Sequence, residues 1–549
     1  MGRPERDYQS LEFTYQRSSD QSAVQPALHP IVVVGAGPVG LALAIDLAQR
    51  GQKVLLLDND HRLSSGSRAI CFAKRTLEIF DRLGCGEAMV AQGVSWNTGK
   101  VFFGDAALFS FDLLPEPGHE RPAFINLPQY YVEGCLADRA AELPELQIRW
   151  QNKVAGVTQH ADHVVLHIDT PDGPYTLHAA HVAACDGSRS SLRQLMGLET
   201  RGRVFQDRFL IADVKMAAEF PPERWFWFDP PFHRNQSVLL HRQPEGVWRI
   251  DFQLGWDADP EDEKRPEKIL PRVRALLAAG ITEKGDGLPS PAPPFELLWA
   301  SVYTFACQRM ERFRHGRVIF AGDSAHGVSP FGARGANSGV QDAENLAWKL
   351  DAVLRGGAAD ALLDSYASER EFAADENILN STRSTDFITP KSPISKLFRD
   401  AVLELAKDHA FARRLVNSGR LSVPATLSAS PLNTPDRDPF DGAMCPGAPA
   451  ADAPLMRGRQ AHWLLRQLGP GFTLLVFGSA PAWARALPLS TLVIGDAGLL
   501  DAEGWAARRY DARPGTAYLI RPDQHVCARW REPNASDVRA ALARASGKD

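Results

Sequence analysis

The residues best suited to chemistry begin with a glycine-rich turn, Gly35-Ala-Gly37-Pro-Val-Gly40, between an apolar run and a helical pattern. In such a turn the first glycine allows the tight bend, the second lets a pyrophosphate approach the backbone, and the third lets helix and strand pack closely. The N–H groups at the start of the helix can then hold phosphate. Asp58 closes a second apolar run, where an acidic side chain can bind ribose hydroxyls. The pattern predicts a dinucleotide site; the plainer alternative is a glycine-rich turn in a core.

Two later motifs each bring an acid to the end of an apolar run. Residues 183–193 contain Asp186-Gly187, and residues 317–326 contain Asp323, followed at 329–339 by a loop rich in small residues. Taken singly, the first would be a surface turn and the second a helix cap. The sequence has no second Gly-x-Gly-x-x-Gly motif, which a reductase with two dinucleotides would normally show. The three motifs together favour FAD.

In this order and spacing, the motifs resemble those of the single-component flavoprotein aromatic hydroxylases, the FAD monooxygenases of the para-hydroxybenzoate hydroxylase type. Within them, the chain is most similar to the group that contains phenol hydroxylase and 3-(3-hydroxyphenyl)propionate hydroxylase. Some members of that group carry a C-terminal thioredoxin-like domain. The resemblance covers residues 30–420 well and residues 440–549 more weakly.

The resemblance implies FAD as the cofactor and assigns its contacts. Gly35, Gly37 and Gly40 correspond to the glycines that cradle the ADP part, and Asp58 to the acid that holds the adenosine ribose. The residues implied to contact the rest of FAD are Arg68, Gln129, Asp186, Gly187, Asp323, Pro330, Gly335, Ala336 and Asn337. A helix that begins at 335–337 would favour negative charge on the pyrimidine edge of the flavin. Many relatives have glycine where Ala333 stands, a departure that bears on the freedom of this loop.

The family's reaction, as the resemblance implies it, uses NADH or NADPH to reduce FAD, and O2 to form a flavin C4a-hydroperoxide that hydroxylates an electron-rich ring. A phenol reacts far better as the phenolate, so a base or acceptor should lie near its hydroxyl. An antiparallel sheet rich in aromatic residues should form the pocket floor. The catalytic candidates on it are His241, Tyr303 and Arg242, with His233 and Gln253 as further candidates and Arg242 or Arg249 as a partner for a substrate carboxylate. For each, the alternative is an exposed or satisfied polar group.

The predicted fold class is α/β: a Rossmann-like FAD-binding domain with a parallel sheet, an interleaved antiparallel-sheet substrate domain and a C-terminal thioredoxin-like α/β domain. Residues 1–29 are a polar extension, residues 30–200 and 305–420 form the FAD-binding domain, and residues 201–304 form the substrate domain. Residues 421–445 are a linker and residues 446–549 the last domain. The charged residues Glu344 and Lys349 are expected on a solvated helix face.

Composition narrows the class of protein further. The 549 residues carry a net charge of −5, which gives no electrostatic case for nucleic acid or an anionic membrane as partner. The seven cysteines form no Cys-x-x-Cys pair, so cytosolic thiols are expected rather than a disulfide framework or a redox dithiol. The N-terminus lacks the apolar core of a secretory signal. We expect a cytoplasmic enzyme without integral membrane contact or metal site. Its expected partners are a small aromatic substrate, O2 and NAD(P)H, and a homodimer is possible.

Two functional alternatives stay open beside aromatic hydroxylation. One is an FAD monooxygenase of the same fold that acts on a non-phenolic substrate such as a polyketide, an alkene or an antibiotic. The other is a flavin-binding protein without turnover, which would bind FAD but show no substrate-stimulated NAD(P)H oxidation. Testing which substrates are hydroxylated distinguishes the first alternative from an aromatic hydroxylase. Measuring NAD(P)H oxidation with and without substrate identifies the second.

Overall fold

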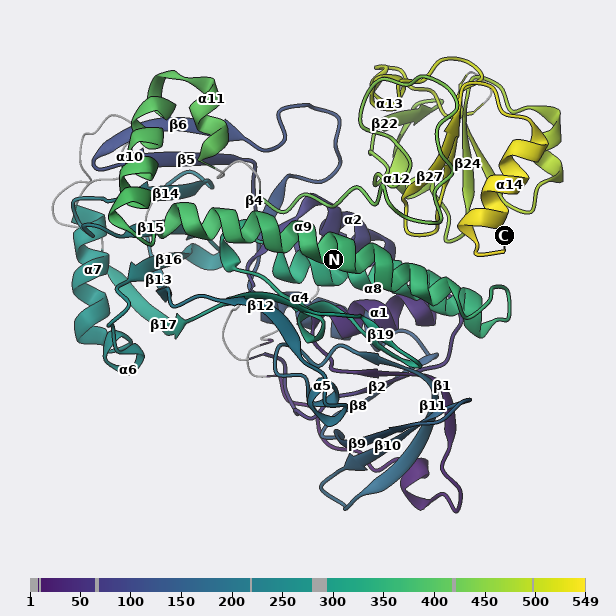
Figure 1. The fold of residues 1–549 in the computed structure, drawn as a ribbon, viewed down its shortest axis with the longest axis horizontal. Helices are drawn as coiled ribbons and strands as arrows, with labels where there is room; N and C mark the ends of the chain where they lie inside the picture. The colour runs from purple at the N-terminus through teal and green to yellow at the C-terminus, as the bar shows by residue number, and fades with distance from the viewer. Residues whose placement is uncertain are drawn as a thin grey trace.

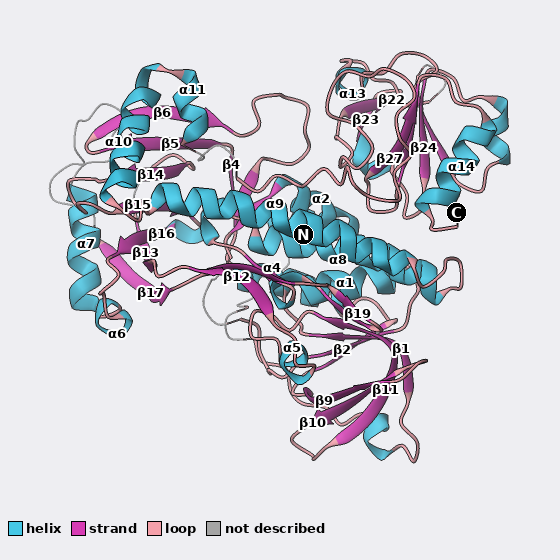
Figure 2. Cartoon of the chain, in the orientation of Figure 1, coloured by secondary structure: helices cyan, strands magenta, loops and turns pink. Residues whose placement is uncertain are grey.

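The structure is a computed structural model that describes residues 8, 11–64, 69–217, 220–278, 294–416, 421–495 and 498–548. Figure 1 shows three regions: a sheet of early strands with helices over one side, a second sheet beneath α10 and α11, and a C-terminal unit beside α2, α8 and α9. In the first region, helices such as α1 and α8 form a layer over the strands (Figure 2). The mixed α/β class predicted from the sequence is confirmed.

The first sheet has eight strands, in the order β19-β20-β11-β1-β2-β8, with β10 and β9 continuing from β11. Its parallel strands are short runs of Val, Ile, Leu and Ala that are buried on both faces, as parallel strands require. The strands are β1 (Leu28–Val34), β2 (Val54–Leu57), β8 (Leu146–Arg149), β9 (Lys153–Gln159), β10 (Val164–Asp169), β11 (Tyr175–Ala184), β19 (Arg314–His315) and β20 (Val318–Phe320). Helices α1 (Pro38–Gln49), α4 (Gln129–Ala140), α5 (Ser191–Leu195) and α8 (Gly335–Leu354) belong to the same region.

The segment before β1 is not simply a polar extension. The ring of Phe13 stacks on Trp150, with 4.0 Å between the ring centroids, and the Tyr8 hydroxyl donates to Asp138 at 2.7 Å. A short helix, η1 (Ser19–Ser22), follows, and Arg149 forms an ion pair with Asp20 at 2.7 Å. The described part of residues 1–29 is therefore anchored on the first sheet.

The second sheet has seven strands, in the order β17-β13-β16-β15-β14-β5-β6. These are β5 (Thr98–Phe103), β6 (Ala106–Asp112), β13 (Arg208–Met216), β14 (Arg224–Phe228), β15 (Ser237–Arg242), β16 (Val247–Leu254) and β17 (Phe295–Tyr303). The assignment of residues 30–200 to the FAD-binding domain alone is wrong at β5 and β6. Strand β5 pairs with β14 in parallel and with β6, so both early strands belong to the second sheet.

Strand alternation gives this second sheet two different buried faces. Trp225 and Trp227 pack with Trp248 and with α7 (Pro266–Ala278) on one face. Phe226 and Phe228 lie on the other face, in a cluster that includes Phe331 from the short helix η4 (Pro330–Gly332). Helix α6 (Pro260–Glu263) precedes α7. The tryptophans are thus ordinary strand packing, and the two phenylalanines face the side of the sheet that α9 (Leu362–Ile388) and α10 (Pro393–Asp408) cover.

Smaller elements join the two sheets. Two three-stranded sheets have the orders β3-β7-β4 and β12-β18-β21. Their strands are β3 (Cys71–Ala73), β4 (Val94–Trp96), β7 (Phe124–Asn126), β12 (Thr200–Val204), β18 (Ala306–Met310) and β21 (His326–Gly327). The helices around them are α2 (Lys74–Leu83), α3 (Gly86–Gln92), α9 (Leu362–Ile388), α10 (Pro393–Asp408) and α11 (Ala410–Leu415), with short turns η2 (Pro244–Gly246), η3 (Gly322–Ser324) and η4 (Pro330–Gly332).

The C-terminal unit is built on a four-stranded sheet with the order β25-β24-β26-β27. Its elements are β22 (Pro454–Arg457), β23 (Gln460–Trp463), α12 (Leu464–Gln467), β24 (Thr473–Phe477), η5 (Ala482–Ala486), β25 (Ser490–Ile494), α13 (Trp505–Arg509), β26 (Ala517–Ile520), β27 (Val526–Trp530) and α14 (Ala535–Ala545). Its likeness to thioredoxin stays a prediction. Among the residues that the structure describes, no helix is long and apolar enough to cross a membrane.

Candidate functional site

The glycine-rich turn lies between β1 and α1, and each glycine has its own steric reason. Gly35 has a φ of +104°, and a Cβ there would stand 2.4 Å from the Cys185 carbonyl oxygen. A Cβ at Gly40 would stand 1.9 Å from the Gly35 oxygen. A Cβ at Gly37, by contrast, would have nothing within 4 Å. Gly35 and Gly40 are therefore needed to fold the turn, whereas Gly37 keeps open the space that a pyrophosphate would fill.

This difference gives a prediction for two alanine variants. Gly37→Ala is expected to keep the thermal stability of the apoprotein but to lose most bound FAD, because the methyl group takes the space of the pyrophosphate. Gly40→Ala is expected to lower stability as well, because the turn must shift. The measurements are the FAD-to-protein absorbance ratio and the melting temperature of the apoprotein. Gly255→Ala is the matched control, since that glycine also has open space. A Gly37→Ala protein with full FAD content would contradict the assignment.

Asp58 follows β2 and reaches back to the turn. Its carboxylate accepts from the Ala36 N–H at 2.5 Å and from the Asp60 N–H at 2.8 Å, and burial raises its pKa. Glu133 on α4 accepts from the Ser64 N–H and from the Gln129 side chain, both within 2.8 Å. Gln129 also accepts from the Ala69 N–H at 3.2 Å. Asp58 and Gln129 are thus brought to the same edge of the first sheet, while Arg68 lies outside the described residues.

The Asp-Gly motif follows β11. The Asp186 carboxylate accepts from the Leu192 N–H at 3.0 Å, while its second oxygen is buried with no hydrogen-bond partner. Gly187 has a φ of +78°, which favours glycine. Arg193 donates to the Ser324 carbonyl at 2.7 Å and to the Ser188 carbonyl at 2.6 Å. The buried Arg193 therefore holds the loop of Asp186 against the loop of Asp323.

The Gly-Asp motif rests on a buried charge network. Asp342 on α8 accepts from the Gly322 N–H at 2.9 Å, from His326 at 2.7 Å and from Arg370 at 2.6 Å. These neighbours hold the pKa of Asp342 below its usual range although the carboxylate is buried. Asp323, next to Gly322, has an exposed side chain. The network fixes the backbone so that an acid is presented where the resemblance implies a ribityl contact.

Helix α8 begins at the proposed flavin edge. Pro330 opens the turn η4, and Ala333 has a left-handed backbone with φ +50° and ψ +39°. Its methyl group therefore strains a position whose backbone conformation favours glycine. Asn337 accepts from the Ala73 N–H at 2.8 Å and donates to the Cys71 carbonyl at 2.9 Å. The start of α8, with Gly335 and Ala336, is thereby tied to β3.

Strand β3 also touches the second sheet. The Cys71 Sγ lies 3.2 Å from the Asn126 side-chain oxygen and 4.0 Å from Nδ1 of His241. Asn126 donates to the Arg242 carbonyl at 2.7 Å. One strand therefore connects the helix that begins at the flavin edge with the polar end of the seven-stranded sheet.

His241 and Asp251 form a buried pair at that polar end. Nε2 of His241 lies 3.2 Å from the Asp251 carboxylate, and because a carboxylate accepts, Nε2 carries the hydrogen. Nδ1 is then the acceptor nitrogen. Burial and the nearby Arg224 guanidinium lower the pKa of His241 to about 4. The imidazole is therefore neutral at pH 7, and its low pKa makes it a weak base unless an anion stands beside it.

The other catalytic candidates are placed differently. Burial raises the pKa of Tyr303 well above its usual range, so its hydroxyl stays a donor close to Asp251. The Arg242 side chain lies with Phe220 and Trp248 on the opposite face of the sheet, so the structure separates it from His241. Arg249 is already paired with Asp213 through two bonds of 2.8 and 2.7 Å. Nε2 of His233 lies 2.6 Å from the Gln253 backbone carbonyl. The Gln253 side chain accepts from the Ser237 N–H at 2.9 Å, so both candidates are engaged with other groups.

Sequence reasoning missed Arg224, which begins β14. It lies close enough to Cys71, Asp251 and Tyr303 for their charges to act on its pKa, which burial lowers. It shares the strand face of Phe226, whose ring centroid lies 5.0 Å from the guanidinium carbon. Alternation along the strand could have identified Arg224, because residues 224, 226 and 228 point to the same face of the sheet. The tryptophans at 225 and 227 drew attention to the other face.

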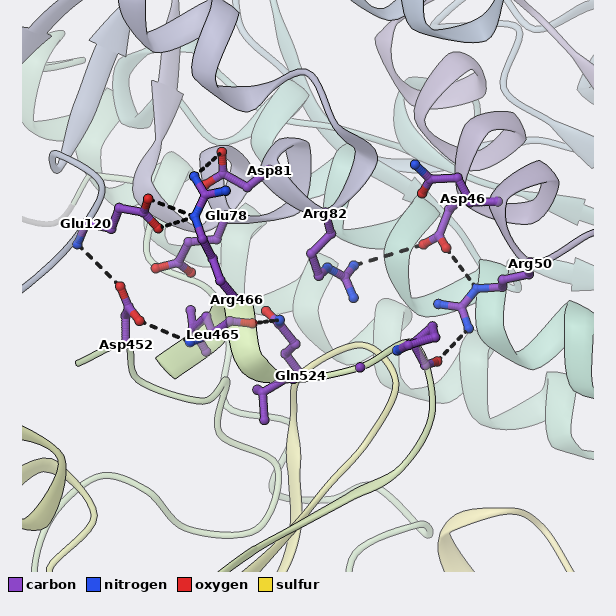
Figure 3. A pocket seen from close by; sticks show the side chains of 14 residues that line it. Asp46, Arg50, Glu78, Asp81, Arg82, Glu120, Asp452, Leu465, Arg466 and Gln524 are labelled. Atoms are coloured by element: carbon purple, nitrogen blue, oxygen red, sulfur yellow. Dashed lines mark hydrogen bonds and ion pairs between the residues drawn. The ribbon is translucent and has the colours of Figure 1, made fainter. Parts of the chain in front are cut away.

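A separate pocket of about 290 Å³ lies between the first region and the C-terminal unit. Figure 3 shows that Arg466 reaches Asp81 and Glu120, and that Asp452 accepts from the Glu120 and Leu465 backbones. Burial raises the pKa of Asp452 to about 6. The pocket touches the C-terminal end of α1, at Asp46, whereas the glycine-rich turn lies at its N-terminal end. A helix of this length spans about 18 Å, so this pocket is an interdomain feature and not the dinucleotide site.

Comparison with known proteins gives one family match. Residues 29–381 match the family described as FAD binding domain. The chain is 28% identical over 546 residues to a 3-(3-hydroxy-phenyl)propionate/3-hydroxycinnamic acid hydroxylase of Mycobacterium sp. (strain JLS), covering 93% of this chain and 91% of the relative. It is also 28% identical over 517 residues to a 12-dehydrotetracycline 5-monooxygenase/anhydrotetracycline 6-monooxygenase of Streptomyces rimosus subsp. rimosus, covering 91% and 95%.

The fold has counterparts among solved structures. The flavin-dependent monooxygenase PieE, solved in complex with FAD and substrate, superposes with a TM-score of 0.81. The match covers 96% of this chain and 100% of that one, at 22% sequence identity. At that identity, the likeness concerns the fold alone.

Proposed function

Because this chain belongs to the FAD binding domain family and is an FAD-dependent monooxygenase of the aromatic hydroxylase family, we propose that it hydroxylates a phenolic ring with NAD(P)H and O2. The observation that carries the proposal is the buried His241–Asp251 pair. It stands on the aromatic face of the second sheet and is connected through Cys71 on β3 to the start of α8, where the flavin is proposed to bind.

The residues present fit FAD. Gly37 leaves the space for the pyrophosphate, Asp58 stands at the edge of β2, and Asp323 is exposed beside the start of α8. Gly35 and Gly40 shape the turn, and Gln129, Asp186, Gly187, Pro330, Gly335, Ala336 and Asn337 complete the proposed set of contacts. When bound, FAD would carry two electrons from NAD(P)H to O2 and so activate the oxygen.

The chain itself handles the substrate's proton and excludes water. Nδ1 of His241 accepts the proton of the phenol hydroxyl, a transfer that the low pKa of His241 opposes until the phenolate formed beside it and the Asp251 carboxylate stabilise the imidazolium. Tyr303 stays protonated at neutral pH, so its hydroxyl can donate a hydrogen bond to the substrate. Phe226, Phe228 and Phe331 give the site an apolar wall, which keeps water from the reacting ring.

The test is NADH and NADPH oxidation in air by the purified FAD-loaded protein, with a panel of phenols and phenolic acids, with hydroxylated product and peroxide both quantified. We expect at least one phenol to stimulate oxidation and to appear as a hydroxylated product. Absence of stimulation by every phenol would contradict the proposal and leave a non-phenolic substrate or a protein without turnover.

A second candidate is hydroxylation of a polycyclic polyketide. It is favoured by the similarity to the dehydrotetracycline and anhydrotetracycline monooxygenase, which extends over 91% of this chain. A polycyclic substrate with an acidic enol or phenol group could use the same proton acceptor. The two candidates are distinguished by assaying one tetracyclic phenol beside the simple phenols. A site shaped for four fused rings should give the tetracyclic phenol the lower KM.

A further inference from the structure

Arg224 is a buried cation, and two of its three guanidinium nitrogens have no hydrogen-bond partner among the described residues. The residue is 3% exposed, and its Nε and Nη1 atoms are buried with no hydrogen-bond partner. Burying a guanidinium without a partner is unfavourable, so such groups are rare without a function. The neighbouring Arg249 shows the ordinary arrangement on the same face, since Asp213 binds it through both oxygens.

The groups around Arg224 come from several elements and form one polar end of the sheet. Cys71 comes from β3, His241 from β15, Asp251 and Arg249 from β16, and Tyr303 from β17. Among the described residues, no carboxylate forms an ion pair with Arg224, because Asp251 faces His241 and Asp213 faces Arg249. Next to this polar end lies the aromatic cluster of Phe226, Phe228 and Phe331.

We propose that Arg224 binds an anionic oxygen of the substrate, which makes the substrate an aromatic compound with an ionised hydroxyl or a carboxylate. This inference rests on the proposed function and deepens it, because it names the charge of the ligand and the residue that selects it. A planar guanidinium with free N–H groups binds such oxygens well, especially where water is excluded. The aromatic cluster then receives the ring.

The two possible sources of the oxygen have a definite proton balance. For a phenol, the O–H bond breaks, the proton goes to Nδ1 of His241, and the electron pair stays on the oxygen beside Arg224. Burial and the charge of Arg224 disfavour the imidazolium, and pairing of Arg224 with the phenolate neutralises the second of these causes. Proton transfer and anion binding therefore support each other. For a carboxylate, the ligand arrives ionised and no proton moves.

The test uses the FAD-loaded enzyme and two probes. Para-nitrophenol reports its own ionisation by colour, and 3-phenylpropanoate has a carboxylate but no hydroxyl. For each, the dissociation constant is measured from the change in the flavin spectrum, for wild type, Arg224→Met, Arg224→Lys and the control Arg201→Met, which removes an exposed arginine paired with Glu311. The pH at which bound para-nitrophenol ionises is measured in the same titrations.

We expect Arg224→Met to weaken binding of one of the anions by about 10- to 100-fold, as for a lost hydrogen bond to a charged group. Arg224→Lys should retain part of the affinity, and Arg201→Met all of it. A loss confined to para-nitrophenol, with its ionisation moved to higher pH, assigns Arg224 to the hydroxyl, and a loss confined to 3-phenylpropanoate assigns it to a carboxylate. Arg224→Met should also melt no lower than wild type, because it removes an unpaired buried charge.

Unchanged affinity for both probes in Arg224→Met, in a wild type that hydroxylates phenols, would overturn the assignment of Arg224 and leave the proposed function standing. A wild type that binds neither probe and hydroxylates no phenol would overturn both. A melting temperature of Arg224→Met far below wild type would also count against a ligand role, because it would show that the guanidinium supports the fold.

Discussion

Glu369→Gln is expected to lower the free energy of unfolding by about 3–5 kcal/mol, the range for removing one partner from a buried ion pair. Glu369 on α9 is fully buried and accepts from Lys349 at 2.8 Å and from Arg521 at 2.6 and 3.0 Å. Arg521 belongs to the C-terminal unit, so the substitution leaves two buried cations with one fewer anion at the boundary between the units. The measurement is thermal and urea unfolding, followed by flavin fluorescence and by circular dichroism.

The control for Glu369→Gln is Glu311→Gln, which breaks the exposed pair with Arg201 and should change stability by less than about 1 kcal/mol. The effect should also depend on pH. Arg521 and Lys349 hold the pKa of Glu369 below its usual range, so its contribution is present at neutral pH and is lost as the pH falls below about 4.5. Equal stability of Glu369→Gln and wild type at pH 7 would contradict the role of this network.

His241→Gln is expected to lower the rate of hydroxylation by about 100- to 10,000-fold, the usual contribution of a positioned general base. Glutamine can still donate to Asp251, but it cannot take the proton of the phenol. FAD content should stay at the wild-type level, because His241 contacts β3 through Cys71 rather than the glycine-rich turn. The measurement is single-turnover product formation, with peroxide quantified in the same samples.

Two further observations decide this prediction. His167→Gln, at an exposed histidine on β10, should behave as wild type. The wild-type rate should show no acid limb near the usual pKa of histidine, because burial and Arg224 lower the pKa of His241 to about 4 and leave the imidazole neutral above that pH. Full hydroxylation by His241→Gln would assign the proton acceptor to another group.

Local patterns sufficed for the dinucleotide unit. Strands β1 and β2 and helix α1 follow one another within 30 residues, and each has a pattern of its own: a buried β-branched run, a glycine turn, a helical period. The steric demands on Gly35 and Gly40 are likewise local, because their closest neighbours are the turn itself and the end of the adjacent strand β11. For that reason the sequence alone predicts this part of the site.

Long-range pairing could not be predicted in the same way. Glu344 and Lys349 are not on a solvated face: Glu344 binds Arg75 at 2.7 Å, and Lys349 binds Glu369. Both are buried because the loop of Arg521 and Asp523, more than 150 residues later, packs over them. Strand β5 joins the second sheet through a parallel pairing with β14 that no local pattern marks. The polar end of the site depends on such pairings.

The most direct test of the account is the source of the oxygen in the product. The wild-type enzyme, loaded with FAD, is run with NADH or NADPH and the phenol that stimulates oxidation most, under ¹⁸O2 in unlabelled water. Mass spectrometry should show one ¹⁸O atom in the hydroxylated ring for each molecule of product. Product that carries oxygen from water, or oxidation that yields peroxide with every phenol and no labelled ring, would contradict monooxygenation of a phenolic substrate.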